Sequence, residues 1–251
     1  MDKPSKMLLC RVSILLLLFT GGLVSGNERA QEIIQHVEDL YRGTSSRART
    51  TMTVETPQYQ RTLTMDSVTM GAEKILIRIL EPKKDRGITT LKQDAEMWNF
   101  FPKINKVIKV PPSMMMASWM GSDFTNDDIV RDTDLTKEYD FTLTETESTY
   151  EIGLTPKQQT VTVWGRIDYV IDKEKLLPIT QTYYDESGEK IRVMSFSKIR
   201  VFGNRSVPSV LEMAPLNKPG YRTVITFEEL ELDAEDVDSN LFTLRNLKKR
   251  F

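Results

Sequence analysis

The most informative stretch of this chain runs from residue 114 to residue 128 and reads MMMASWMGSDFTNDD. Four of the twelve methionines lie within its first seven residues, beside Trp119 and ahead of an acidic run. Pro111 and Pro112 precede it; they lack backbone N–H donors and disfavour helix just before the stretch. Methionine is flexible and polarizable, and it is frequent where one surface accepts several apolar shapes. The stretch predicts an adaptable apolar contact surface, with ordinary core packing as the alternative.

The second half of the same stretch is polar. Its acidic residues at 123–128 could belong to a calcium loop, but Gly121 precedes the acids, so the EF-hand order of alternating acids followed by glycine is absent. A capped helical turn is the favoured interpretation. Thr125 or Asn126 would cap it, and the two aspartates that follow would lie where the helix dipole favours negative charge.

The N-terminal segment has the features of an export signal. Three basic residues precede an apolar run at 12–19, and Val24-Ser25-Gly26 supplies small residues for cleavage. The run is too short to span a bilayer. We expect residues 1–26 to be a cleaved signal peptide and residues 27–251 to form one domain, because no Gly/Ser-rich or Pro-rich linker divides them. The protein would then be exported and free in its compartment after cleavage.

Charge and cysteine content exclude several classes of protein. The expected mature chain has 31 basic and 35 acidic side chains, with no basic stripe, so nucleic acid is not an expected partner. Cys10, the single cysteine, lies before the apolar run, where a lipid-modified cysteine is not expected. The mature chain would therefore have no disulfide and no thiol chemistry.

The patterning predicts one N-terminal helix followed by strands. Residues 27–41 place apolar side chains at helical spacing, with Asn27 available as N-cap and Gly43 just past the end. Alternation and turn signals then predict an antiparallel sheet or barrel. The expected strands cover residues 62–65, 74–80, 98–100, 107–110, 139–146, 169–171, 176–184, 191–199, 210–213 and 221–227.

A change of phase in the last predicted strand makes a sharper prediction. Ile225 and Phe227 are apolar at odd positions, whereas Leu230 and Leu232 are apolar at even positions. Strict alternation would turn one pair to water. We therefore expect a β-bulge or bend around residues 228–229.

Catalytic chemistry is poorly represented. The single histidine, His36, falls beside the apolar stripe of the predicted helix, where a surface or boundary position is expected. There is no Gly-x-Ser-x-Gly elbow, no Gly-x-Gly-x-x-Gly fingerprint and no phosphate-binding loop. We expect no enzyme, no catalytic residues, no metal site and no cofactor.

Several segments together resemble a known family. Residues 119–128, WMGSDFTNDD, closely resemble a signature of the LolA-like outer-membrane lipoprotein-sorting proteins. The resemblance extends through YYDESG at 183–188, GNRSVP at 203–208 and FTLRNL at 242–247, and is best from Thr50 to Phe251. It implies an α+β fold: a strongly curved antiparallel sheet that forms an incomplete β-barrel, covered by helices.

The same resemblance implies a function. LolA-type proteins carry lipoprotein acyl chains across the periplasm, so the resemblance implies a periplasmic location. The expected partners are acyl chains of lipoproteins or other lipids, with transient membrane contact. An inner-membrane transporter of the RND or ABC type is a further expected partner, and the chain itself would be a monomer. The alternative is a LolA-fold sensor or adaptor that binds a protein partner instead of shuttling lipid.

Eight residues are the candidates for the lipid cavity or its lid, with packing of the lid on the sheet as the alternative for each. Trp98 and Phe100 share one strand face that we expect to line the interior. The others come from the Met-rich stretch: Met114, Met115, Met116, Trp119, Met120 and Phe124.

Overall fold

The computed structural model describes residues 26–131 and 135–249. Residues 1–25, which hold nearly all of the expected signal peptide, lie outside that range, as does Phe251. Within the described ranges, no helix combines the length and the apolar character needed to cross a membrane.

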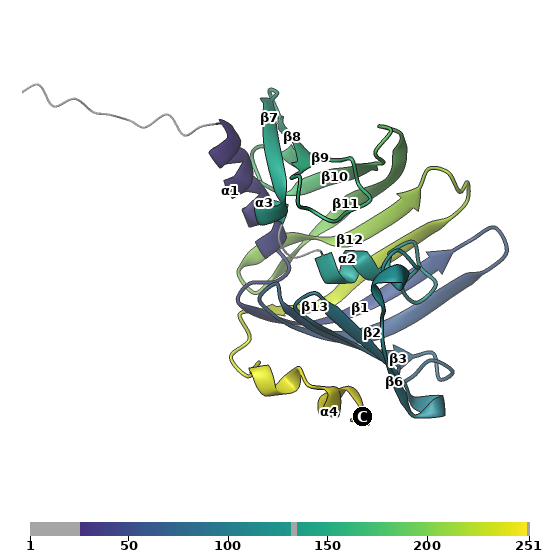
Figure 1. Ribbon diagram of the computed structural model, residues 1–251. Coiled ribbons are helices and arrows are strands. Elements are labelled where there is room, and N and C mark those ends of the chain that lie inside the picture. The colour runs from purple at the N-terminus through teal and green to yellow at the C-terminus, as the bar shows by residue number, and fades with distance from the viewer. Residues whose placement is uncertain (1–25, 132–134, 250–251) are drawn as a thin grey trace, which may run out of the picture.

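The chain forms one open sheet of thirteen strands, and every neighbouring pair is antiparallel. The order is β6-β5-β4-β3-β2-β1-β13-β12-β11-β10-β9-β8-β7, so β6 and β7 are its two edges. Strong curvature brings both wings around a central concavity (Figure 1). The strands are β1 Ser45–Glu55, β2 Gln60–Met70, β3 Lys74–Glu81, β4 Thr89–Gln93, β5 Glu96–Phe101, β6 Lys106–Lys109, β7 Tyr139–Glu145, β8 Thr149–Pro156, β9 Arg166–Asp172, β10 Pro178–Tyr184, β11 Lys190–Phe202, β12 Arg205–Pro215 and β13 Arg222–Leu232.

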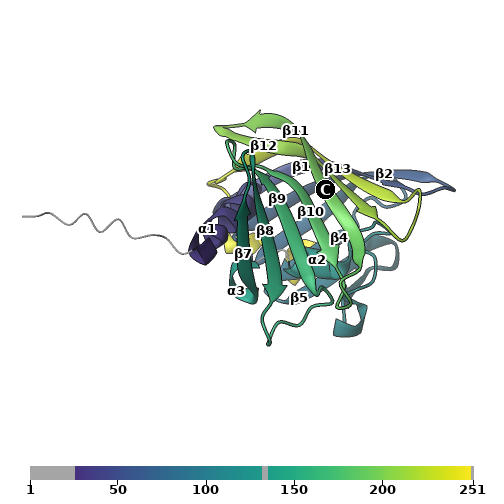
Figure 2. The same ribbon diagram turned by 90° about the horizontal axis from the view of Figure 1, so that it is seen from above.

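Few helices accompany the sheet. They are α1 Gly26–Asp39, α2 Asn126–Arg131, α3 Leu135–Glu138 and α4 Leu244–Leu247, with 3₁₀ turns η1 Pro102–Ile104, η2 Pro112–Met114 and η3 Ser239–Leu241. Figure 1 shows α2 inside the concavity, and α4 on the other side of the sheet, below β1–β3. Seen from above, α1 lies beside β7 and β8 at one edge (Figure 2). The expected α+β fold with an unclosed sheet is confirmed.

The N-terminal helix forms as its periodicity predicts. Ala30, Ile33, Ile34 and Val37 are buried against β7–β9, whereas His36 is exposed. Gly43 follows the helix with a φ of +56°, and its N–H donates to the carbonyl of residue 39. This left-handed ending suits glycine, which has no Cβ to clash. The helix begins at Gly26, however, so the expected N-cap role of Asn27 is not found.

The predicted bulge in β13 is confirmed. Arg49 of β1 pairs with Glu229 and Thr50 pairs with Phe227, so Glu228 is an extra residue without a partner on β1. The bulge shifts the alternation by one position. Both apolar pairs therefore face the interior: Ile225 packs in the core of the sheet, and Leu230 is buried near the end of α1.

Two separate apolar layers cover the two faces of β2–β5. On the concave face, the lid segment (residues 111–131) packs Trp119 and Val130 against Met52, Met65 and Met97. On the opposite face, the C-terminal segment packs Phe242, and Leu247 of α4, against residues of β3–β5, namely Leu76, Leu91, Trp98 and Phe100. Both faces of the sheet are thus buried over β2–β5.

Candidate functional site: a lidded apolar cavity

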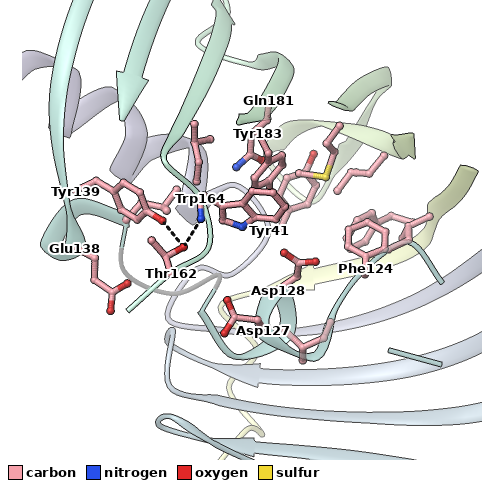
Figure 3. Close-up of a pocket in the computed structure, with 17 residues that line it drawn as sticks. Tyr41, Phe124, Asp127, Asp128, Glu138, Tyr139, Thr162, Trp164, Gln181 and Tyr183 are labelled. Atoms are coloured by element: carbon pink, nitrogen blue, oxygen red, sulfur yellow. Dashed lines mark hydrogen bonds between the residues drawn. The ribbon is translucent and has the colours of Figure 1, made fainter. Parts of the chain in front are cut away.

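A cavity of about 250 Å³ lies between the lid segment and the concave face of β9–β13. Aromatic and aliphatic side chains dominate its wall, and carboxylates from α2 and α3 stand on the lid side (Figure 3). The lining residues are Tyr41, Phe124, Asp127, Asp128, Ile129, Leu135, Glu138, Tyr139, Thr162, Trp164, Ile167, Gln181, Tyr183, Met194, Leu211, Ile225 and Phe227.

A second cavity of about 200 Å³ adjoins the first, under the end of α1 and against β1 and β2. Five side chains line both cavities and form the wall between them: Tyr41, Gln181, Met194, Leu211 and Phe227. Tyr41 and Phe227 stack with ring centroids 5.1 Å apart, and the Tyr41 hydroxyl donates to the carbonyl of Pro208 at 2.8 Å. Burial raises the pKa of Tyr41, so this hydroxyl stays protonated and keeps its hydrogen bond.

The signature residues form a tight reversal in the lid segment. Ser118 and Thr125 make an isolated antiparallel bridge, and the Trp119 N–H donates to the Phe124 carbonyl at 2.8 Å. The tip needs two consecutive left-handed residues, Met120 with a φ of +52° and Gly121 with a φ of +74°. Because only the second is glycine, the Met120 backbone is strained.

The predicted capped turn follows this reversal and is confirmed. The Asp128 N–H donates to the Thr125 hydroxyl at 3.1 Å, and the Thr125 N–H donates to the Asp128 carboxylate at 2.7 Å. This reciprocal pair is a capping box at the start of α2, with Asp in the place more often taken by Glu. In the described residues, no cluster of three or more acidic, histidine or cysteine side chains could hold a metal ion.

Polar contacts attach the lid to both wings of the sheet. Toward β13, the backbone N–H of Asp123 donates to the Thr223 hydroxyl at 2.9 Å, and that hydroxyl donates to the Asp123 carboxylate at 2.7 Å. Toward β2, the Arg61 guanidinium donates to the Met120 carbonyl at 3.3 Å and pairs with Asp85 at 2.9 Å. The lid is therefore held at its tip as well as at its helix.

The strongest attachment joins α2 to β11. Both carboxylate oxygens of Asp128 accept from Arg192, at 2.8 and 2.5 Å, and the Arg192 side chain is only 5% exposed. Its guanidinium carbon lies 4.4 Å from the ring centre of Trp164 and 4.1 Å from that of Tyr183, so two rings enclose the cation. Burial lowers the pKa of Arg192, but the charge and hydrogen bonds of Asp128 outweigh it and leave that pKa above its ordinary value.

The residues of the Met-rich stretch have different surroundings. Phe124 lines the first cavity. Trp119 is buried against the wing formed by β1–β5, with its indole N–H donating to Thr90 at 3.2 Å, and Met115 and Met120 pack in the same cluster. Met114 and Met116 are exposed on the outside of the lid.

The expectation that Trp98 and Phe100 line the interior is corrected. They do share one face of β5, but that face is covered by the C-terminal segment, and neither residue lines the cavity. The concave face of the strand carries Met97 and Asn99, which lie beneath the lid. The alternation was therefore identified correctly and assigned to the wrong side of the sheet.

Several cavity residues were not predicted. Gln181 and Tyr183 lie on one face of a strand that the sequence did indicate, so alternation could have placed them together. Trp164 lies between β8 and β9, where hydrophobic periodicity carries no signal. Tyr41 is the last residue of the predicted helix, but α1 ends at Asp39 and leaves Tyr41 in the turn that follows. The ion-pair partner of Asp128, Arg192, is 64 residues away in the sequence and had no local signature.

Comparison with known proteins places the fold. Residues 71–249, well over half of the chain, match the model of a family described as "uncharacterized protein". The chain belongs to this family. No curated protein matches the sequence.

Solved structures show that the chain has the LolA-like fold. It is similar to an outer membrane lipoprotein-sorting protein domain from Vibrio parahaemolyticus (TM-score 0.77, 18% identity, 89% of this chain and 100% of that one). It is also similar to a DUF1329 family protein from Desulfovibrio piger (0.78, 21%, 88% and 99%). A LolA superfamily protein from Nitrosomonas europaea gives comparable values (0.71, 18%, 86% and 98%). The resemblance noted in the sequence is confirmed at the level of the fold.

Proposed function

We propose that this protein is a periplasmic carrier that holds acyl chains of lipoproteins or other lipids and moves them toward the outer membrane. The observation that carries the proposal is the apolar cavity of about 250 Å³ enclosed between the concave sheet and the lid segment. An apolar cavity of about 150 Å³ already accommodates benzene. The second cavity provides room for a chain to extend beyond the wall at Tyr41 and Phe227.

The energetics of acyl burial fit a carrier. Burying a chain of roughly sixteen carbons stabilises the complex by about 0.8 kcal/mol per methylene, or about 12 kcal/mol in total. A bilayer offers a similar gain per methylene. Cargo is therefore exchanged readily only when the cavity matches the membrane closely. Met194, which lines both cavities, supplies an adaptable part of the wall for that purpose.

The remaining parts of the proposal follow the expected export signal and the fold. Residues 27–251 would act as one monomeric domain after removal of residues 1–26. The name of one similar structure mentions outer membrane lipoprotein sorting, which supports a periplasmic location. An inner-membrane transporter of the RND or ABC type would supply the cargo. No step of this activity requires a catalytic group.

A cationic and apolar surface at the sheet edge supports transient membrane contact. Residues 102–116, which we call the edge segment, contain three lysines and no acidic residue, although acidic side chains exceed basic ones in the whole chain. Exposed on it are Lys103, Ile104, Lys106, Ile108, Lys109, Met114 and Met116. Lysines near an anionic bilayer contribute about 1 kcal/mol each, and exposed apolar side chains add insertion at the interface.

Lipid analysis of protein purified without detergent tests the carrier function. We expect mass spectrometry to find co-purified acyl lipids, and a fluorescent acyl probe to be taken up and displaced by unlabelled fatty acid. Failure of both measurements would reject the proposal. Recovery of one stoichiometric protein partner with no lipid would instead favour the sensor or adaptor function.

A further inference from the structure

The wall between the two cavities contains a polar group that the fold does not use. Gln181 of β10 is 4% exposed and lies between Tyr169 on β9 and Met194 on β11. Within the part of the chain that the structure describes, its carboxamide has no hydrogen bond to another side chain or to the backbone. Because no protein group satisfies this amide, its hydrogen-bonding capacity is available to a ligand in the cavity.

The Gln181 carboxamide faces open space. Among the described residues, the amide of Gln181 is not one of the fully enclosed side-chain atoms that lack a hydrogen-bond partner. Gln181 borders both cavities, so the space that its amide reaches is the cavity interior. In Figure 3 it lies beside Tyr183, above the carboxylates of the lid.

Neither the residues that share the wall with Gln181 nor its cross-strand neighbour Tyr169 makes a hydrogen bond with the amide in the described structure. Met194, Leu211 and Phe227 are apolar, and the Tyr41 hydroxyl donates to Pro208 instead. Farther along the first cavity, the Thr162 hydroxyl accepts from the Trp164 N–H at 3.2 Å, and Asp128 is paired with Arg192. The amide of Gln181 can thus donate a hydrogen bond from this wall to a ligand in the cavity.

We propose that Gln181 is a specificity-determining residue that donates a hydrogen bond to the acyl carbonyl of the cargo. A carboxamide supplies two N–H donors and one acceptor oxygen, and an ester or amide carbonyl needs a donor when it leaves water. The position of Gln181 at the junction would place that carbonyl between the two cavities, with the hydrocarbon chain against the apolar wall. The inference rests on the proposed carrier function and deepens it from acyl chains in general to chains that keep their carbonyl.

A matched pair of ligands tests this role. Palmitoyl lysophosphatidylcholine carries an ester carbonyl, and its hexadecyl ether analogue lacks it but is otherwise equivalent. Both are used as monomers to displace a fluorescent apolar probe from the full-length mature protein. We expect the wild-type protein to prefer the ester by about three- to tenfold, the value of one net hydrogen bond.

Variants assign the preference to one side chain. Gln181→Met keeps the length of the side chain and removes its polar atoms, so we expect equal affinity for ester and ether. Met194→Leu changes the cross-strand neighbour in the same wall and should keep the ester preference. Because Gln181→Met removes an unpaired buried amide, its melting temperature should equal or exceed that of the wild type, which separates loss of recognition from loss of fold.

The possible outcomes are distinct. Equal binding of ester and ether by the wild type, or an ester preference that persists in Gln181→Met, would overturn the role of Gln181 and leave the carrier function standing. If neither ligand displaces the probe and no lipid co-purifies, the carrier function and the role of Gln181 are both rejected.

Discussion

Asp128 of α2 and Arg192 of β11 form a bidentate ion pair that holds the lid helix against the concave face of the sheet. The pair is buried, with 5% of the arginine side chain and 15% of the aspartate side chain exposed. Asp128 also accepts the Thr125 N–H, so one carboxylate both caps α2 and holds it to β11. Lid position and lid helicity therefore depend on the same group.

Replacing Asp128 by Asn should destabilise the protein strongly. The substitution leaves the Arg192 cation buried between Trp164 and Tyr183 without its counter-charge, and breaking a buried pair in this way costs about 3–5 kcal/mol. Urea unfolding of Asp128→Asn checks this. The double variant Asp128→Asn/Arg192→Met should recover much of the loss; a double variant as unstable as the sum of the single ones would contradict the coupling.

A substitution at Thr125 tests the capping box without removing the Asp128–Arg192 ion pair. Thr125→Ala removes the hydroxyl that accepts the Asp128 N–H and should lower the free energy of unfolding by about 0.5–2 kcal/mol. Thr125→Ser keeps the hydroxyl and should stay within about 0.5 kcal/mol of the wild type. Chemical denaturation of the two variants gives the comparison, and equal losses would show that the hydroxyl does not cap.

Filling the wall between the cavities should block cargo uptake. Leu211 lines both cavities, and Leu211→Trp would occupy space at their junction. We expect uptake of a fluorescent acyl probe to fall at least about tenfold, while overpacking typically costs about 1–3 kcal/mol of stability. Leu216→Trp, on an exposed residue outside both cavities, is the matched control. Unchanged uptake by a folded Leu211→Trp would show that cargo binds elsewhere.

Neutralising the edge segment should weaken membrane contact. Lys103→Gln/Lys106→Gln removes two exposed charges, worth about 2 kcal/mol together near an anionic surface, or roughly 30-fold in affinity. Sedimentation with vesicles of phosphatidylethanolamine and phosphatidylglycerol measures this, and added salt should reduce wild-type binding. Lys218→Gln, in an exposed turn, should bind as the wild type does. Equal binding by all three proteins would exclude the edge segment.

Most of the scaffold could be predicted because local patterns specify it. The periodicity of α1, the turn signals between strands and the change of phase in β13 each identify a local feature that the structure contains. Thr125 and Asp128 lie three residues apart, so the capping box was also visible in the sequence.

The cavity was harder to predict because it is assembled from distant segments. Alternation on β5 correctly placed Trp98 and Phe100 on one face of the strand. Because the strand is buried on both faces, however, the pattern could not indicate which face meets the lid. The pair of Asp128 with Arg192, and the position of Gln181, depend on the curvature that brings β9–β11 over α2. Such contacts have no signature in a single sequence.

The two edges of the sheet, β6 and β7, are not hydrogen-bonded to each other. In a closed ring of strands, a wider interior requires ladder bonds to break or slide. Here the wings can spread by a small change of twist at each of twelve strand pairs, with every ladder intact. Under the proposed carrier function, the size of an admissible cargo is then governed by how far the lid contacts stretch, and a range of chain lengths would enter one molecule without unfolding any part of its wall.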